Sequence, residues 1–65
     1  MKVIFLCKET ETFLHIDNVE FLKKETVAIG FSEKKFRHEW HLKIKNIIYE
    51  KTYPCSKFEI HTIIS

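Results

Sequence analysis

The chain is poor in the residues that make tight turns, disulfides and metal sites: its 65 residues include one glycine, one proline and two cysteines. A single glycine excludes the glycine-rich loops that cradle nucleotide phosphates. The length excludes the large nucleotide-binding and barrel enzymes. Cys7 and Cys55 are the only cysteines and have no CxxC spacing, and two cysteines are too few for the dense disulfide framework of small secreted domains. We therefore expect two reduced thiols rather than a Cys7–Cys55 disulfide.

Long apolar runs are also lacking. The run at the start, Val3–Cys7, has five apolar residues, whereas a secretory signal needs about 7–15 and a membrane helix about 20. We therefore expect a soluble, cytoplasmic protein without a membrane partner.

Apolar and aromatic side chains are plentiful: 45% of the residues are hydrophobic and 14% aromatic. This is enough for a single domain over residues 1–65, and it argues against disorder. A domain this short buries only about 60% of the surface that its unfolded chain exposes, so a homo-oligomer would supplement the core. The net charge of +2 is mild but uneven, because residues 1–32 carry four basic and five acidic groups and residues 33–65 carry seven basic and four acidic groups.

The clearest structural signal is an unbroken alternation between Phe36 and Ile44, which is typical of a strand lying on a core. The alternation predicts that one set of side chains faces the core and the other faces water. The predicted core face holds Phe36, His38, Trp40, Leu42 and Ile44, and the predicted solvent face holds Arg37, Glu39, His41 and Lys43.

Other segments favour strands as well, because they are short and rich in β-branched and aromatic residues. Met1–Cys7 is apolar on both faces, which indicates a central strand. We expect an all-β fold: a small antiparallel meander of five or six strands, curled or closed into a barrel. Asp17 followed by Glu20 leaves room for one short helical turn at about 18–24. An α+β fold with a helix at about 33–50 is the alternative.

Four histidines raise the question of a zinc site, which needs about four converging ligands. His38 and His41 point to opposite faces of a strand and cannot share an ion. His41 and His61 would meet only if their strands pair, beside Glu39 or Glu59. We expect no metal, no cofactor, no catalytic residue and no small-molecule substrate.

Two kinds of binding surface remain. A single-layer core cannot cover both faces of the most apolar strands, so some apolar side chains should lie in a subunit or partner interface. The candidates are Ile4, Leu6, Ile48 and Ile63. The basic second half offers a nucleic-acid face, where bases would stack on an aromatic ring beside cations. The candidates are Arg37, Lys43, Lys45 and Tyr53.

The succession of phrases "MKVIFL", "IDNVEFL", "TVAIGF", "FRHEWHLKI" and "NIIYEKTY" covers about the first fifty residues. In this layout the chain resembles small uncharacterised β-meander proteins from phages and prophages of low-GC Gram-positive bacteria. The resemblance implies an accessory or host-interaction role and no particular functional residue. We therefore expect a non-enzymatic accessory or regulatory protein that binds another protein or itself, with a homodimer favoured. A small nucleic-acid-binding barrel is the alternative.

Overall fold

The computed structural model describes residues 1–30 and 35–65. Within these residues the chain forms six strands and no helix, which confirms the all-β prediction. The strands are β1 (Lys2–Cys7), β2 (Thr12–Ile16), β3 (Val19–Ala28), β4 (Phe36–Ile44), β5 (Glu50–Pro54) and β6 (Phe58–Ile64).

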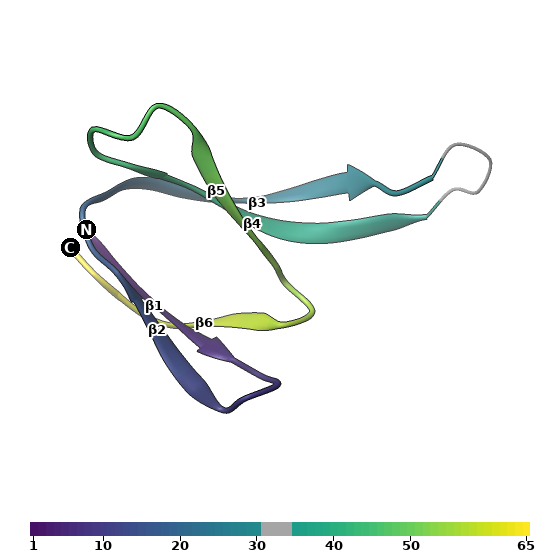
Figure 1. Cartoon of the computed structure of the whole chain (residues 1–65), viewed down its shortest axis with the longest axis horizontal. Helices are drawn as coiled ribbons and strands as arrows, with labels where there is room; N and C mark the ends of the chain where they lie inside the picture. Colours follow the sequence, from purple (N-terminus) through teal and green to yellow (C-terminus); the bar gives the residue numbers. More distant parts are fainter. Residues whose placement is uncertain (31–34) are drawn as a thin grey trace.

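The strands form two three-stranded antiparallel sheets (Figure 1). The N-terminal sheet has the order β2-β1-β6, and the C-terminal sheet has the order β3-β4-β5. The expected closed barrel is wrong: β6 does pair with β1, but β2 is not paired with β3 and β5 is not paired with β6, so the described strands remain in two separate sheets. As the apolar composition of Met1–Cys7 predicts, β1 is a central strand.

The two sheets meet where β2 leads into β3. Asn18 turns the chain with a φ of 59°, a left-handed value that asparagine tolerates better than most residues. The amide of Val19 donates to the carbonyl of Met1 at 2.8 Å, and the amide of Lys45 donates to the carbonyl of Asn18 at 2.8 Å. These bonds tie the bend to β1 on one side and to the end of β4 on the other.

Two sequence-based alternatives are corrected by this arrangement. The residues expected as a helical turn at about 18–24 lie mostly in β3, where Leu22 pairs directly with Leu42 of β4. The helix proposed at about 33–50 is replaced by β4, the following loop and the start of β5; positions 33 and 34 lie outside the described residues. Burial of an apolar face against the other sheet outweighs the local capping signal.

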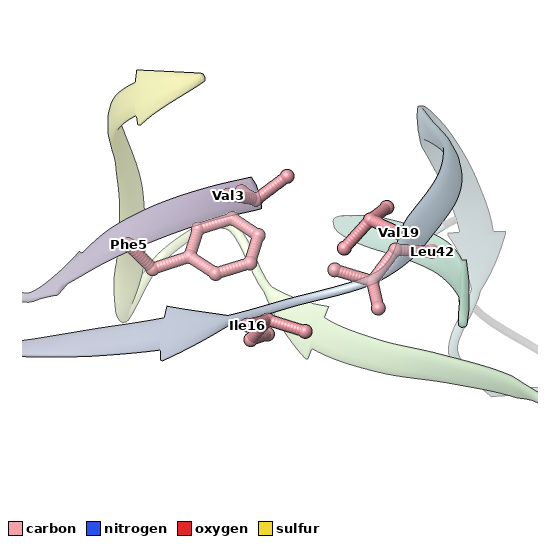
Figure 2. Packing of buried hydrophobic residues seen from close by; sticks show 5 residues of the cluster. All are labelled: Val3, Phe5, Ile16, Val19 and Leu42. Atoms are coloured by element: carbon pink, nitrogen blue, oxygen red, sulfur yellow. The ribbon is translucent and has the colours of Figure 1, made fainter. Parts of the chain in front are cut away.

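The core lies between the inner faces of the two sheets (Figure 2). The ring of Phe5 is its centre, with ring centroids 6.4 Å from Trp40, 5.4 Å from Tyr53 and 6.2 Å from Phe58. The buried hydrophobic residues are Val3, Phe5, Ile16, Val19 and Leu42.

The hairpin of β3 and β4 extends beyond the core (Figure 1). β5 pairs with β4 only between Glu39 and Lys43, and the last backbone contact on that side is the bond from the amide of Cys55 to the carbonyl of His38, so Phe36 lies beyond the paired part of β4. Phe36, expected on the core face, is therefore 61% exposed. The Cα radius of gyration is 12.9 Å, against about 11 Å for a compact chain of this length.

Candidate interaction surface

The outer face of the N-terminal sheet is apolar at its centre. Ile4 and Leu6 alternate with the buried Val3 and Phe5, so they point away from the core. In the register of β1 and β2, Ile4 lies opposite His15 and Leu6 lies opposite Phe13. We call these side chains, with His61 of β6, the N-terminal outer face. It consists of Ile4, Leu6, Phe13, His15 and His61.

His61 joins this face because of a bulge in β6. Phe5 pairs with Ile60 and Ile4 pairs with Thr62, so His61 is an extra residue with no partner in β1. A bulge of this kind changes the direction of a side chain. The imidazole reaches Phe13, with ring centroids 4.7 Å apart and planes at 66°, and its Nδ1 lies 2.8 Å from the hydroxyl of Thr62.

The Phe13–His61 contact spans the whole sheet. Phe13 comes from β2 and His61 from β6, which flank β1 on opposite sides. Strands two places apart are about 10 Å apart, so the rings meet above β1. Ile4 and Leu6 on β1 are half-buried, while Phe13 itself remains 53% exposed. The face is therefore a partly formed second apolar layer.

The other two interface candidates lie elsewhere. Ile63 pairs with Val3, so it points to the inner side of the sheet, at its edge. Ile48 lies in the loop between β4 and β5 and is 97% exposed. The structure thus brings Ile4 and Leu6 together and separates Ile48 and Ile63 from them.

Hydrogen bonds hold the loop that carries Ile48. The amide of Ile47 donates to the carbonyl of Ile44 at 3.1 Å. The ammonium of Lys43 donates to the carbonyls of Ile44, at 3.0 Å, and of Ile47. Asn46 adopts a left-handed φ of 67°. The exposed side chains of Ile48 and Tyr49 therefore project from a defined backbone.

The nucleic-acid candidates do not form a common face. The phenol ring of Tyr53 packs in the core, 5.1 Å from the ring of Phe58, so it offers no platform for a base. Arg37 is engaged by Glu39 at 2.9 Å, and Lys43 by the loop carbonyls. Lys45 is exposed. Stacking needs aromatic rings and cations on one surface, and these four residues do not provide it.

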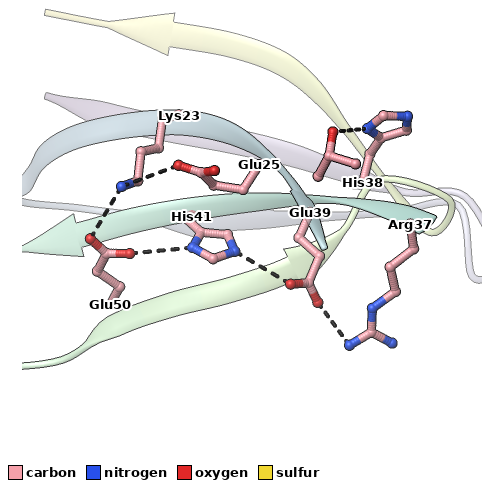
Figure 3. Close-up of polar contacts among 8 residues, drawn as sticks. Lys23, Glu25, Arg37, His38, Glu39, His41 and Glu50 are labelled. Carbon is pink, nitrogen blue, oxygen red and sulfur yellow. Dashed lines mark hydrogen bonds and ion pairs between the residues drawn. The ribbon is translucent and has the colours of Figure 1, made fainter. Parts of the chain in front are cut away.

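The outer face of the C-terminal sheet carries a chain of ion pairs and polar contacts (Figure 3). Its first part links Arg37, Glu39 and His41, because the carboxylate of Glu39 lies 2.9 Å from the guanidinium and 3.3 Å from imidazole Nε2. Its second part links His41 Nδ1 to Glu50 at 3.3 Å, and Glu50 to Lys23 at 3.7 Å. Lys23 also pairs with Glu25 at 3.3 Å.

Glu39 is the residue that sequence reasoning missed. Alternation correctly assigns it to the face opposite Trp40, but it is only 8% exposed rather than solvated. The neighbours Arg37 and His41 cover it and supply its partners. The signal for this cluster is the sequence Arg37, Glu39, His41, in which a carboxylate has a hydrogen-bonding side chain two residues away on either side, on the same face of the strand.

No metal site is formed among the described residues: no three His, Cys, Asp or Glu side chains converge. His41 lies in the C-terminal sheet and His61 in the N-terminal sheet, and their strands do not pair. Both thiols are free. A hydrogen bond from the side chain of Thr10 lowers the pKa of the Cys7 thiol, whereas burial raises the pKa of the Cys55 thiol.

Comparisons with family models, curated proteins and solved structures give no match to this chain. In the part of the chain that the structure describes, no helix has the length and apolar character needed to cross a bilayer.

Proposed function

We propose that the chain is a non-enzymatic protein-binding module that binds through the N-terminal outer face. The role is that of an accessory or regulatory protein in the bacterial cytoplasm, of the phage or mobile-element kind that the sequence resembles. Binding is proposed because the surface offers an apolar patch around Phe13.

The observation that carries this proposal is the 53% exposure of Phe13, which lies on the edge strand β2 opposite the apolar Leu6. Ile4 and Leu6 beside it are half-buried, while Phe13 and His61 are both exposed. Large aromatic side chains surrounded by apolar residues are the usual anchors of protein interfaces. A bound partner would complete the second apolar layer.

The surface of the whole molecule supports the same proposal. In the described chain, nine large hydrophobic side chains are exposed and five are buried. The accessible surface is 4903 Å², whereas a compact monomer of this mass exposes about 4,400 Å². Exposed large hydrophobic side chains mark sites of association, and Phe13 is the one of these nine that belongs to the N-terminal outer face.

Photocrosslinking in cells tests the proposal. A benzophenone amino acid replaces Phe13 in one variant and Thr52 in a control, since Thr52 is exposed on the opposite sheet. We expect protein adducts, to a second copy or to another protein, at position 13 and not at position 52. Adding Leu6→Lys to the first variant should abolish them. Equal labelling at both positions, or none at position 13, would contradict the proposal.

A further inference from the structure

We propose that the partner of the N-terminal outer face is a second copy of the chain, packed face to face with its β1 antiparallel to the first. This inference rests on the proposed function and names its partner. A self-complementary face is the requirement for a symmetric dimer, and the distribution of charge along β1 meets it.

One end of the face carries Lys2 with its partner Asp17, and the other end carries Glu59. Lys2 begins β1 and points to the same side as Ile4 and Leu6. Glu59 of β6 lies opposite Leu6, at the other end of the face. Between them the centre of β1 is apolar. The ammonium of Lys2 lies 3.9 Å from the carboxylate of Asp17, and because the two side chains are 38% and 69% exposed, this ion pair contributes little.

A two-fold axis that crosses β1 at Ile4 brings the Lys2 end of each copy to the Glu59 end of the other. It sets Ile4 of each copy against Ile4 of the other, and it places Lys2 of each copy above Leu6 and beside Glu59 of the other. The dimer then gains two ion pairs at the rim of its apolar contact, each between Lys2 of one copy and Glu59 of the other. An axis parallel to β1 would instead set Lys2 against Lys2, and like charges oppose such an approach. The charges therefore favour the antiparallel arrangement.

The size of the face sets the strength of the dimer. Three strands are about 14 Å wide, and a six-residue β1 is about 20 Å long. Taken as flat rectangles, two such faces bury roughly 600 Å² in total. A stable standard interface buries about 1,200–2,000 Å² of accessible surface. The dimer should therefore be weak and depend on concentration in the micromolar to millimolar range.

Light scattering after gel filtration, from micromolar to millimolar protein, gives the first test. The mass should rise from 7.9 kDa toward twice that value as the concentration increases. Leu6→Lys should stay monomeric, with an unchanged β-type circular-dichroism spectrum and Trp40 emission as evidence of folding. A wild-type chain that remains a monomer at millimolar concentration overturns the inference.

Charge exchange tests the orientation. Lys2→Glu and Glu59→Lys should each weaken association by about tenfold, because two attractive pairs become repulsive. Mixing the two variants, or combining both changes in one chain, should restore it. Lys45→Glu and Glu20→Lys are matched controls at exposed positions away from the face, and they should leave association unchanged. Failure of the double variant to recover overturns the antiparallel arrangement.

The outcomes separate this inference from the function on which it rests. A monomeric chain that still crosslinks another protein at position 13 refutes the second copy and leaves the binding function standing. A monomeric chain without adducts refutes both.

Discussion

The indole N–H of Trp40 donates to the backbone carbonyl of Phe58 at 3.0 Å. Trp40 belongs to β4 and Phe58 to β6, so this single bond joins the two sheets. It closes over the ring of Phe5, which contacts both residues. The polar end of the one tryptophan is thus satisfied inside the core while its rings add apolar contact, as a buried tryptophan requires.

Trp40→Phe should therefore lower the free energy of unfolding by about 1–3 kcal/mol, because it removes the donor and leaves a partly buried carbonyl without its partner. Urea denaturation followed by circular dichroism measures the change. Tyr53→Phe is the matched control, since it keeps the ring contacts with Phe5 and Phe58. Equal losses in the two variants would show that the indole N–H contributes nothing specific.

Leu42 in β4 is fully buried, whereas Ile48 in the loop that follows β4 is 97% exposed. Leu42→Ala should cost about 2–5 kcal/mol through lost burial and the cavity left behind. Ile48→Ala should change stability by less than about 0.5 kcal/mol. Thermal and urea unfolding of both variants provide the measurement. A comparable loss in Ile48→Ala would mean that its side chain is covered in solution.

The strands were predictable from the sequence because alternation reports which side chains share a face. It located β4 at Phe36–Ile44 and identified Met1–Cys7 as a central strand. It could not report how far a neighbouring strand extends. Phe36 has the correct parity for the core face, yet it is exposed because β5 pairs with β4 only from Glu39 onward.

The candidate site was predictable in part for the same reason. Because both faces of β1 are apolar and the core covers one of them, the sequence identified Ile4 and Leu6 as side chains that lie outside the core. The Phe13–His61 contact depends on a bulge in β6, and one extra residue in a strand leaves little trace in the sequence pattern. Alternation also does not report which strands pair with one another, so the sequence alone could not distinguish two separate sheets from a closed barrel.

Glu39 depends on Arg37 for compensation of its charge. Arg37→Ala should destabilise the fold by about 1–3 kcal/mol, less than for a fully buried ion pair because the guanidinium is itself half exposed. The loss should shrink in a Glu39→Gln background, where no carboxylate charge remains. A double-mutant cycle measured by urea denaturation isolates the coupling.

Lys57→Ala is the control for that cycle. It removes an ion pair with Glu9 at 3.6 Å in which both side chains are well exposed. Its effect should stay below about 0.5 kcal/mol. Additive losses for Arg37→Ala and Glu39→Gln would contradict the dependence of the buried carboxylate on its neighbour.

The two thiols should differ in reactivity, because the thiolate is the reactive form. The hydrogen bond from Thr10 lowers the pKa of Cys7, and burial raises the pKa of Cys55. At a pH below both pKa values Cys7 therefore holds the larger thiolate fraction. Alkylation by iodoacetamide, followed by mass spectrometry, should modify Cys7 first. The increase of the alkylation rate with pH should begin at a lower pH for Cys7 than for Cys55.

Thr10→Val tests the cause of that difference. Without the hydroxyl donor the pKa of Cys7 rises, so its alkylation should slow at neutral pH and approach the original rate at alkaline pH, where the thiol is ionised in both proteins. Cys55 is the internal control, because Thr10 is not among the groups that shift its pKa. A uniform slowing of Cys7 at every pH would instead indicate altered access to the sulfur, and a parallel change at Cys55 would indicate a general loosening of the fold.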